Sequence, residues 1–198
     1  MNFLAHALLA GSLESDQVGG LIGDFVKGPL PAGLPQELAS GVALHRAIDS
    51  FADRHPAFLA SRARISPLRR RVSGVLVDLF YDHLLARDWA DHGRGSLDDY
   101  AGQLYAMLHA HSSALSEDAR EVIDLMRRHN WLCGYRNVEA IGRTIDRMAV
   151  YRLRRATTLA GGIEEFFADS EGFEADFRTF LPDALEFAAH WRRQRDAQ

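Results

Sequence analysis

Residues 72–85 read VSGVLVDLFYDHLL and are apolar around almost the whole circumference of a helix, apart from Asp78, Asp82 and His83. A helix that is apolar all round is typically buried in the core. Pro67 suits the first position of a helix, and the helical pattern continues to about Trp89. We therefore expect a central helix over residues 67–89, around which the rest of the chain packs.

The same helical periodicity runs through almost the whole chain, without a long alternating strand pattern. It predicts nine helices, over residues 2–10, 14–27, 35–54, 67–89, 97–111, 117–129, 137–154, 163–168 and 170–195, together with a short turn of helix over residues 56–64. The expected fold class is all-α, with residues 1–198 forming a single compact helical bundle. At 198 residues and 47% hydrophobic content, the chain has enough apolar material for one core, which excludes a largely disordered protein.

Charge and cysteine content narrow the class of protein further. A net charge of −4 argues against nucleic acid or an anionic membrane as a partner. The lone cysteine, Cys133, excludes an intrachain disulfide and a zinc site built on cysteines. The start of the chain lacks signal-peptide features, and no apolar stretch approaches a membrane span. We expect a protein of the reducing cytoplasm, and the sequence leaves its oligomeric state open.

The predicted helix 35–54 carries ionisable residues on its apolar face. At about 100° per residue, Asp49 lies about 40° from His45, within the arc occupied by Val42 and Ile48. Asp53 continues this stripe one turn later. Burying an isolated carboxylate costs several kcal/mol unless it is paired or binds a metal.

The predicted central helix repeats this anomaly. Asp78 and Asp82 are one turn apart and share a stripe with Arg71, whereas His83 points about 100° away from Asp82. Asp24 also stands among apolar residues, and His6 shares a stripe with Asn2.

Two interpretations fit these buried polar stripes. One is a divalent metal site in a helical bundle, because carboxylate oxygens and imidazoles are suitable ligands for Mn²⁺. The other is a buried ion-pair network in which Arg46 and Arg71 neutralise Asp49 and Asp78. One helix alone favours the ion pairs, but two helices with the same anomaly, together with Asp24, favour the metal site.

Arginines cluster next to this predicted site, at Arg62, Arg64, Arg69, Arg70 and Arg71. A solvated surface is the ordinary interpretation of such a cluster. The alternative is a docking surface for an acidic partner or a phosphate group, which arginine recognises well.

Four motifs in register give the chain a family resemblance. They are Met1-Asn2-Phe3-Leu4-Ala5-His6, Gly23-Asp24-Phe25-Val26-Lys27-Gly28, His45-Arg46-Ala47-Ile48-Asp49 and Asp78-x-x-x-Asp82-His83-x-Leu85. Together they closely resemble the acyl carrier protein phosphodiesterase family. That family removes phosphopantetheine from holo acyl carrier protein with a divalent metal, typically Mn²⁺, and is regarded as a divergent relative of the HD phosphohydrolases. The chain itself contains no His-Asp dipeptide.

The resemblance implies an HD-domain-like bundle and roles for particular residues. The metal ligands would be all or some of Asp24, His45, Asp49, Asp78 and Asp82. His83 or His6 would act as general acid towards the leaving serine oxygen, and Arg46 would stabilise the phosphoryl oxygens. The acidic carrier protein would dock on Arg62, Arg64, Arg69 and Arg70.

Two other functions stay open. An HD-like phosphohydrolase would act on nucleotides or small phosphoesters without a protein partner. A non-enzymatic carrier-binding protein would need no metal, and the double polar stripe argues against it.

Overall fold

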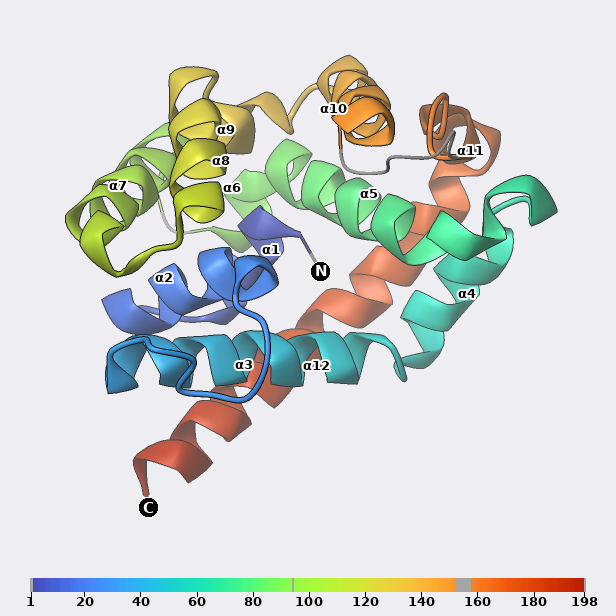
Figure 1. Cartoon of the computed structure of the whole chain (residues 1–198). Helices are drawn as coiled ribbons and strands as arrows, with labels where there is room; N and C mark the ends of the chain where they lie inside the picture. The colour runs from blue at the N-terminus through green and yellow to red at the C-terminus, as the bar shows by residue number, and fades with distance from the viewer. Residues whose placement is uncertain (1, 94, 152–157, 198) are drawn as a thin grey trace.

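The computed structural model describes residues 2–93, 95–151 and 158–197, and within these ranges it is all-α without a strand (Figure 1). The α-helices are α1 (Phe3–Leu9), α2 (Glu14–Ile22), α3 (Gln36–Ala52), α4 (Pro56–Arg64), α5 (Ser73–Arg87), α6 (Trp89–His92), α7 (Leu97–Ala110), α8 (Glu117–Arg128), α9 (Trp131–Gly134), α10 (Val138–Tyr151), α11 (Ile163–Ala168) and α12 (Ser170–Asp196). Three short 3₁₀ helices add to them: η1 (Gly23–Phe25), η2 (Pro67–Val72) and η3 (Ser112–Ala114). None of the helices in these ranges combines the length and apolar character that crossing a membrane requires.

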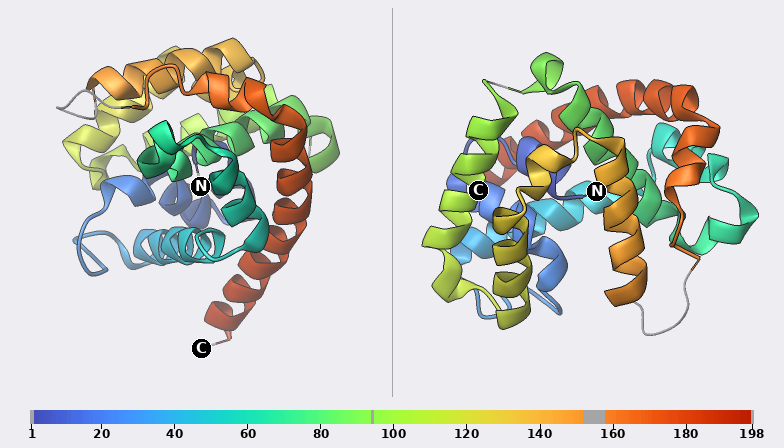
Figure 2. Two further views of the ribbon diagram at one scale, coloured as in Figure 1. Left: turned by 90° about the vertical axis from the view of Figure 1, so that its right-hand side faces the viewer. Right: turned by 90° about the horizontal axis from the view of Figure 1, so that it is seen from above.

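Helix α5 occupies the centre, as its sequence predicts. Leu76, Val77, Phe80 and Tyr81 are completely buried, and α5 contacts α1, α4, α10 and α12. Figure 2 shows α1 near the middle of the molecule in both views, with the long α12 along one side. The short α1 is therefore enclosed by α2, α5 and α12, which it contacts.

Several predicted boundaries are wrong in an informative way. The expected helix 67–89 is divided at Val72 into η2 and α5, because Glu165 accepts hydrogen bonds from the backbone and side chain of Ser66 and from Arg69. These contacts hold the start of η2 against α11. The expected helix 14–27 ends as an α-helix at Ile22, and the chain continues as η1. The last three residues of the expected helix 137–154, residues 152–154, lie outside the described ranges. The short helices α6 and α9 were not predicted.

Two glycines set the distance between α2 and α3. A Cβ atom on Gly19 would lie 2.4 Å from the backbone carbonyl carbon of Gly41, and one on Gly41 would lie 2.5 Å from the carbonyl oxygen of Ser15. Only glycine allows the two backbones to approach this closely. Gly19 and Gly41 therefore permit the close packing of α2 against α3.

The end of α12 fastens the first two helices. Arg195 donates from Nη1 to the fully buried Asp16 of α2 at 2.6 Å, and Arg192 donates to the carbonyl oxygen of Leu9 in α1. An unpaired carboxylate at that depth would be costly, so Arg195 makes the burial of Asp16 possible. The last turns of the chain thus help to hold the helix that carries His6.

Candidate metal centre

Helix α3 provides a histidine and an aspartate that point to the same place. His45 Nε2 lies 3.2 Å from Asp49 Oδ2, as expected for residues one turn apart on a helix. His45 is buried, whereas the Asp49 side chain is 38% exposed. Asp49 therefore stands between the core and an open space.

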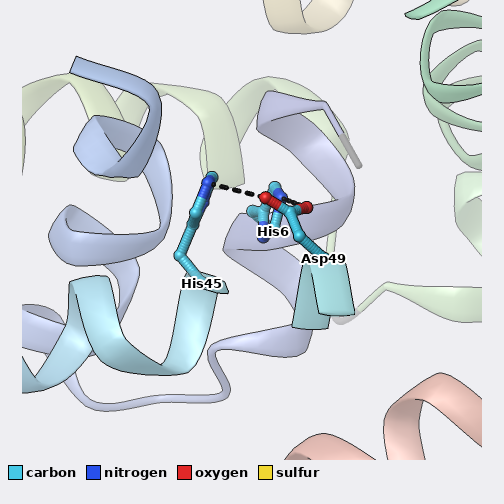
Figure 3. A group of neighbouring side chains, drawn as sticks. All are labelled: His6, His45 and Asp49. Carbon is cyan, nitrogen blue, oxygen red and sulfur yellow. Dashed lines mark hydrogen bonds and ion pairs between the residues drawn. The ribbon is translucent and has the colours of Figure 1, made fainter. Parts of the chain in front are cut away.

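Helix α1 brings a second histidine to the same carboxylate (Figure 3). His6 Nε2 lies 3.1 Å from Asp49 Oδ1, and the His6 and His45 rings are stacked with centroids 3.8 Å apart. His6 is only 1% exposed. Asp49 thus receives one imidazole at each oxygen, although His6 and His45 come from helices far apart in the sequence.

The surroundings of His45 determine which ring nitrogen faces Asp49. His45 Nδ1 donates to the carbonyl oxygen of Gly20 at 2.9 Å, which leaves Nε2 directed at the carboxylates. A Cβ on Gly23 would lie 2.3 Å from the His45 ring, so that position has room only for glycine. A backbone carbonyl that fixes the far nitrogen of a histidine is a common arrangement around metal-binding imidazoles.

Burial and pairing give the two histidines opposite protonation behaviour. Burial, together with the neighbouring His45, lowers the pKa of His6 to about 3, despite the carboxylate of Asp49. Burial also disfavours charge on His45, but Asp24 and Asp49 outweigh it and raise its pKa to about 9. Burial would likewise raise the pKa of Asp49, but both histidines hold it well below its usual range.

These donors form a possible metal-binding triad. One ligand atom from each of His6, His45 and Asp49 can be chosen so that all lie within 4.8 Å of one another. Two imidazole nitrogens and a carboxylate oxygen are a donor set that first-row divalent metals accept. The histidines are buried and one is already neutral, so the residues fit a metal ion.

A cleft of about 340 Å³ opens beside the triad. Asp49 belongs to both, and the cleft is lined by three further carboxylates, from Asp24, Asp53 and Asp78. Asp24 Oδ1 lies 3.7 Å from His45 Nε2, which places it next to the triad, and this ion pair with His45 lowers its pKa. Burial raises the pKa of Asp78, which also lines the cleft. Asp24, Asp49 and Asp78, three of the expected metal ligands, therefore line the same cleft.

Asp82 occupies a different position from the one that the resemblance implied. It is 0% exposed, and its two oxygens accept the backbone N–H groups of Leu4 and Ala5, each at 2.9 Å. Burial raises its pKa to about 7, and these two donors oppose that rise. Both oxygens are thus engaged at the start of α1, so the contacts of Asp82 are those of a helix cap supplied by another helix.

His83 and Arg46 also make contacts outside the triad. His83 Nδ1 donates to the carbonyl oxygen of Tyr135 at 2.8 Å, and its ring packs edge-on against Phe166. Arg46 donates to the carbonyl oxygen of Val26 at 2.9 Å and so holds the segment that follows Asp24. Arg71, which was the expected partner of Asp78, is exposed on η2.

The arginine cluster divides into paired and open members. Arg62 lies 3.3 Å from Asp53, Arg64 pairs with Asp169 and Asp176, and Arg69 pairs with Glu165 at 3.0 Å. Arg70 is exposed and forms no ion pair within the part of the chain that the structure covers. Three of the four predicted docking arginines therefore fasten α4 and η2 to neighbouring segments.

Some residues of the site gave no local signal in the sequence. Phe58 of α4 and Met148 of α10 line the cleft, but each belongs to an ordinary amphipathic pattern. The role of Gly23 follows from its position next to His45, which only the fold supplies.

The chain is similar to a family of known enzymes over most of its length. The family model described as acyl carrier protein phosphodiesterase matches residues 1–184. A protein named acyl carrier protein phosphodiesterase from Photorhabdus laumondii is 31% identical over 192 residues, covering 95% of each chain. Relatives of the same name from Serratia proteamaculans and Yersinia pestis are each 30% identical, over 95% and 96% of this chain and 97% and 98% of their own.

No solved structure matches the chain significantly. The family model nonetheless spans residues 1–184, which include every residue of the triad and the cleft, and the relatives cover at least 95% of the chain. The chain therefore belongs to the acyl carrier protein phosphodiesterase family.

Proposed function

We propose that this chain hydrolyses the phosphodiester that links phosphopantetheine to a serine of holo acyl carrier protein, giving the apo carrier and free phosphopantetheine. Membership of the family supports the reaction, and the triad of His6, His45 and Asp49 beside an open cleft supports a metal-dependent mechanism. We further propose Mn²⁺ as the metal, because it accepts both imidazole nitrogen and carboxylate oxygen.

Electrostatics is the main argument for a metal. Four carboxylates line the cleft, and a phosphodiester anion entering it would be repelled by them. A divalent cation on the triad would offset part of this negative charge and give the phosphoryl oxygens a positive centre to bind. When bound, such a metal supplies Lewis-acid stabilisation of the phosphoryl oxygens and lowers the pKa of a water molecule.

The protein's own residues hold and orient the reacting groups. His6, His45 and Asp49 would bind the metal, and Asp24 is the nearest further carboxylate. Gly20 fixes the ring of His45, and Asp82 fixes the start of the helix that carries His6. Arg46 acts indirectly, by holding the backbone at Val26 close to Asp24. Asp78 stays a cleft residue in this proposal, and His83 is left out of the reaction.

The carrier protein would approach over η2. Arg70 and Arg71 are exposed there, and η2 leads directly into Gly74 and Val75 at the cleft. Arg62, Arg64 and Arg69 already have carboxylate partners within the protein. Arg70 and Arg71 are therefore the members of the cluster best placed to meet an acidic partner.

The test is mass spectrometry of holo acyl carrier protein incubated with the enzyme and Mn²⁺, with EDTA and a His45→Ala enzyme as controls. We expect the carrier to lose the mass of its phosphopantetheine arm only when the wild-type enzyme and the metal are both present. An intact holo carrier under every metal tested would contradict the proposal. Hydrolysis of nucleotides or small phosphoesters alone would instead support a general HD-like phosphohydrolase.

A further inference from the structure

We propose that the apolar part of the cleft beside the triad binds the pantetheine arm of the substrate, with Gly74 providing the space that the arm needs. This inference rests on the proposed function, because it assigns the part of the substrate beyond the reacting phosphate to a place in the structure.

The cleft beside the triad is lined by both polar and apolar side chains. Asp49 belongs to the triad and Asp24 lies beside it. Asn2, Asp53 and Asp78 also line the cleft, and its apolar lining consists of Ala52, Phe58, Gly74, Val75, Leu79 and Met148. Phe58 and Leu79 are buried in the core, so this wall is held rigidly. A preformed cavity that combines apolar side chains with a small number of polar groups is the usual form of a small-molecule site.

Helix α3 sets the direction in which a substrate would lie. Asp49 contacts both histidines, and Ala52 and Asp53 follow on the same face about one turn, or roughly 5 Å, further along. A phosphate held at the triad therefore places its attached chain along Ala52 and Asp53 towards α4 and α5.

The pantetheine arm matches this arrangement. It is a narrow, mostly aliphatic chain with a branched dimethyl carbon near the phosphate and two amides further along. Its methyl groups suit the apolar wall, and its amide N–H groups suit a carboxylate acceptor such as Asp53. The cavity, at about 340 Å³, falls within the usual range for small-molecule sites.

Substitution of Gly74 by a larger residue is the most direct way to fill the cleft. A Cβ atom on Gly74 would have no heavy atom within 4 Å, although Gly74 lies in the first turn of α5 and lines the cleft. A larger side chain can therefore be added without a clash at its Cβ. Gly102 of α7 is a matched control, because its Cβ would also meet nothing within 4 Å and it does not line the cleft.

The experiment compares Gly74→Leu with Gly102→Leu in the full-length protein. We expect Gly74→Leu to lower kcat/KM for holo acyl carrier protein by at least about tenfold while the Kd for Mn²⁺ changes by less than about twofold. Gly102→Leu should change neither. Wild-type kcat/KM in Gly74→Leu, or a loss that accompanies loss of Mn²⁺, would overturn the inference.

Two further measurements keep the inference testable on its own. Val75→Trp alters the same wall at a position that is 38% exposed, so it tests the cleft even if Gly74→Leu does not fold. Calorimetric titration of free phosphopantetheine into the Mn²⁺-loaded protein tests arm binding without the carrier. Binding that Gly74→Leu weakens would support the inference even if the carrier is not cleaved, whereas equal binding or none would refute it.

Discussion

Helices α3 and α5 both carry acidic residues on faces that should be apolar, yet the two sets of carboxylates do different things. On α3, Asp49 is partly exposed and meets two imidazoles at the edge of a cleft. On α5, Asp82 is fully buried and accepts two backbone N–H groups of α1. The same anomaly in a sequence can therefore mark a ligand or a structural cap, and what faces the carboxylate decides between them.

Helix α1 connects the two regions. Asp82 binds the backbone at Leu4 and Ala5, and His6 follows immediately on the same helix. Asn2, which precedes α1, makes no capping hydrogen bond with its side chain to the described residues. The carboxylate on α5 thus substitutes for a local cap and, in doing so, holds His6 against the site on α3.

The largest expected effect comes from removing a donor on α3. His45→Ala should lower turnover of holo acyl carrier protein by more than about a hundredfold, since losing even an outer-shell partner costs roughly 10- to 100-fold. His83→Ala is the matched control, because it removes a buried histidine from α5. Turnover of the carrier, measured by mass spectrometry, checks both variants. Equal losses of turnover in His45→Ala and His83→Ala would contradict the assignment of the metal site to α3 rather than α5.

Removing the carboxylate on α5 should act mainly on stability. Asp82→Ala leaves two buried N–H groups without acceptors, so we expect the free energy of unfolding to fall by about 3 kcal/mol. Asp82→Asn keeps one acceptor oxygen and should lose less. Urea denaturation measures both changes, and an Asp82→Ala protein that is fully stable but cannot bind Mn²⁺ would make Asp82 a ligand.

Crowding the ring of His45 should weaken the metal site without touching a donor. A methyl group on Gly23 would meet the ring at 2.3 Å, so Gly23→Ala should raise the Kd for Mn²⁺ by about 10- to 100-fold. Gly134→Ala adds the same methyl group where nothing lies within 4 Å. Unchanged Mn²⁺ affinity in Gly23→Ala would show that the orientation of His45 is unimportant.

The α3 region should also respond to pH through His45. Its pKa in the folded, metal-free protein is raised to about 9 from 6.5, so its protonated form stabilises the fold below pH 6.5 and this stabilisation is lost as the pH rises through 9. A metal must displace that proton, whereas His6 is already neutral. Mn²⁺ affinity should therefore rise by up to about tenfold per pH unit between pH 6.5 and 8.5. A flat titration across that range would argue against His45 as a ligand.

The smallest expected effect comes from the surface arginines. An arginine that is exposed to solvent and one that forms ion pairs within the protein should respond differently to charge reversal. Arg70→Glu should raise the KM for the carrier protein a few-fold and flatten its dependence on salt, because Arg70 is open to solvent. Arg64→Glu should instead lower the melting temperature, since Arg64 pairs with Asp169 and Asp176. Steady-state kinetics at two salt concentrations measure the effect on KM, and thermal melts measure the effect on stability. A raised KM in Arg64→Glu but not in Arg70→Glu would make Arg64, rather than Arg70, the docking residue.

Much of the fold follows from local patterns. The apolar circumference of residues 72–85 predicted the central helix, and α4 and α11 have the predicted bounds. The shared face of His45 and Asp49 follows from their spacing, and the 3.2 Å contact confirms it. Such features depend on residues within one or two turns of each other.

The rest depends on contacts between distant segments. Asp82 has the same spacing pattern whether it faces a metal or the N–H groups of Leu4 and Ala5, which lie nearly eighty positions earlier. Three of the predicted docking arginines instead form ion pairs within the protein, with carboxylates such as Glu165 of α11 and Asp176 of α12. Neither outcome has a signature in the local sequence, because the partner of a charged group is chosen by the packing of whole helices.

The most direct test of the difference between α3 and α5 is a Mn²⁺ titration, followed by electron paramagnetic resonance, of the wild-type, His45→Ala and Asp82→Asn proteins at one pH. We predict that the wild-type protein binds Mn²⁺, that Asp82→Asn keeps this binding at lower thermal stability, and that His45→Ala loses it while staying folded. Retention of Mn²⁺ by a folded His45→Ala protein, together with its loss from a folded Asp82→Asn protein, would contradict the assignment of the metal site to α1 and α3.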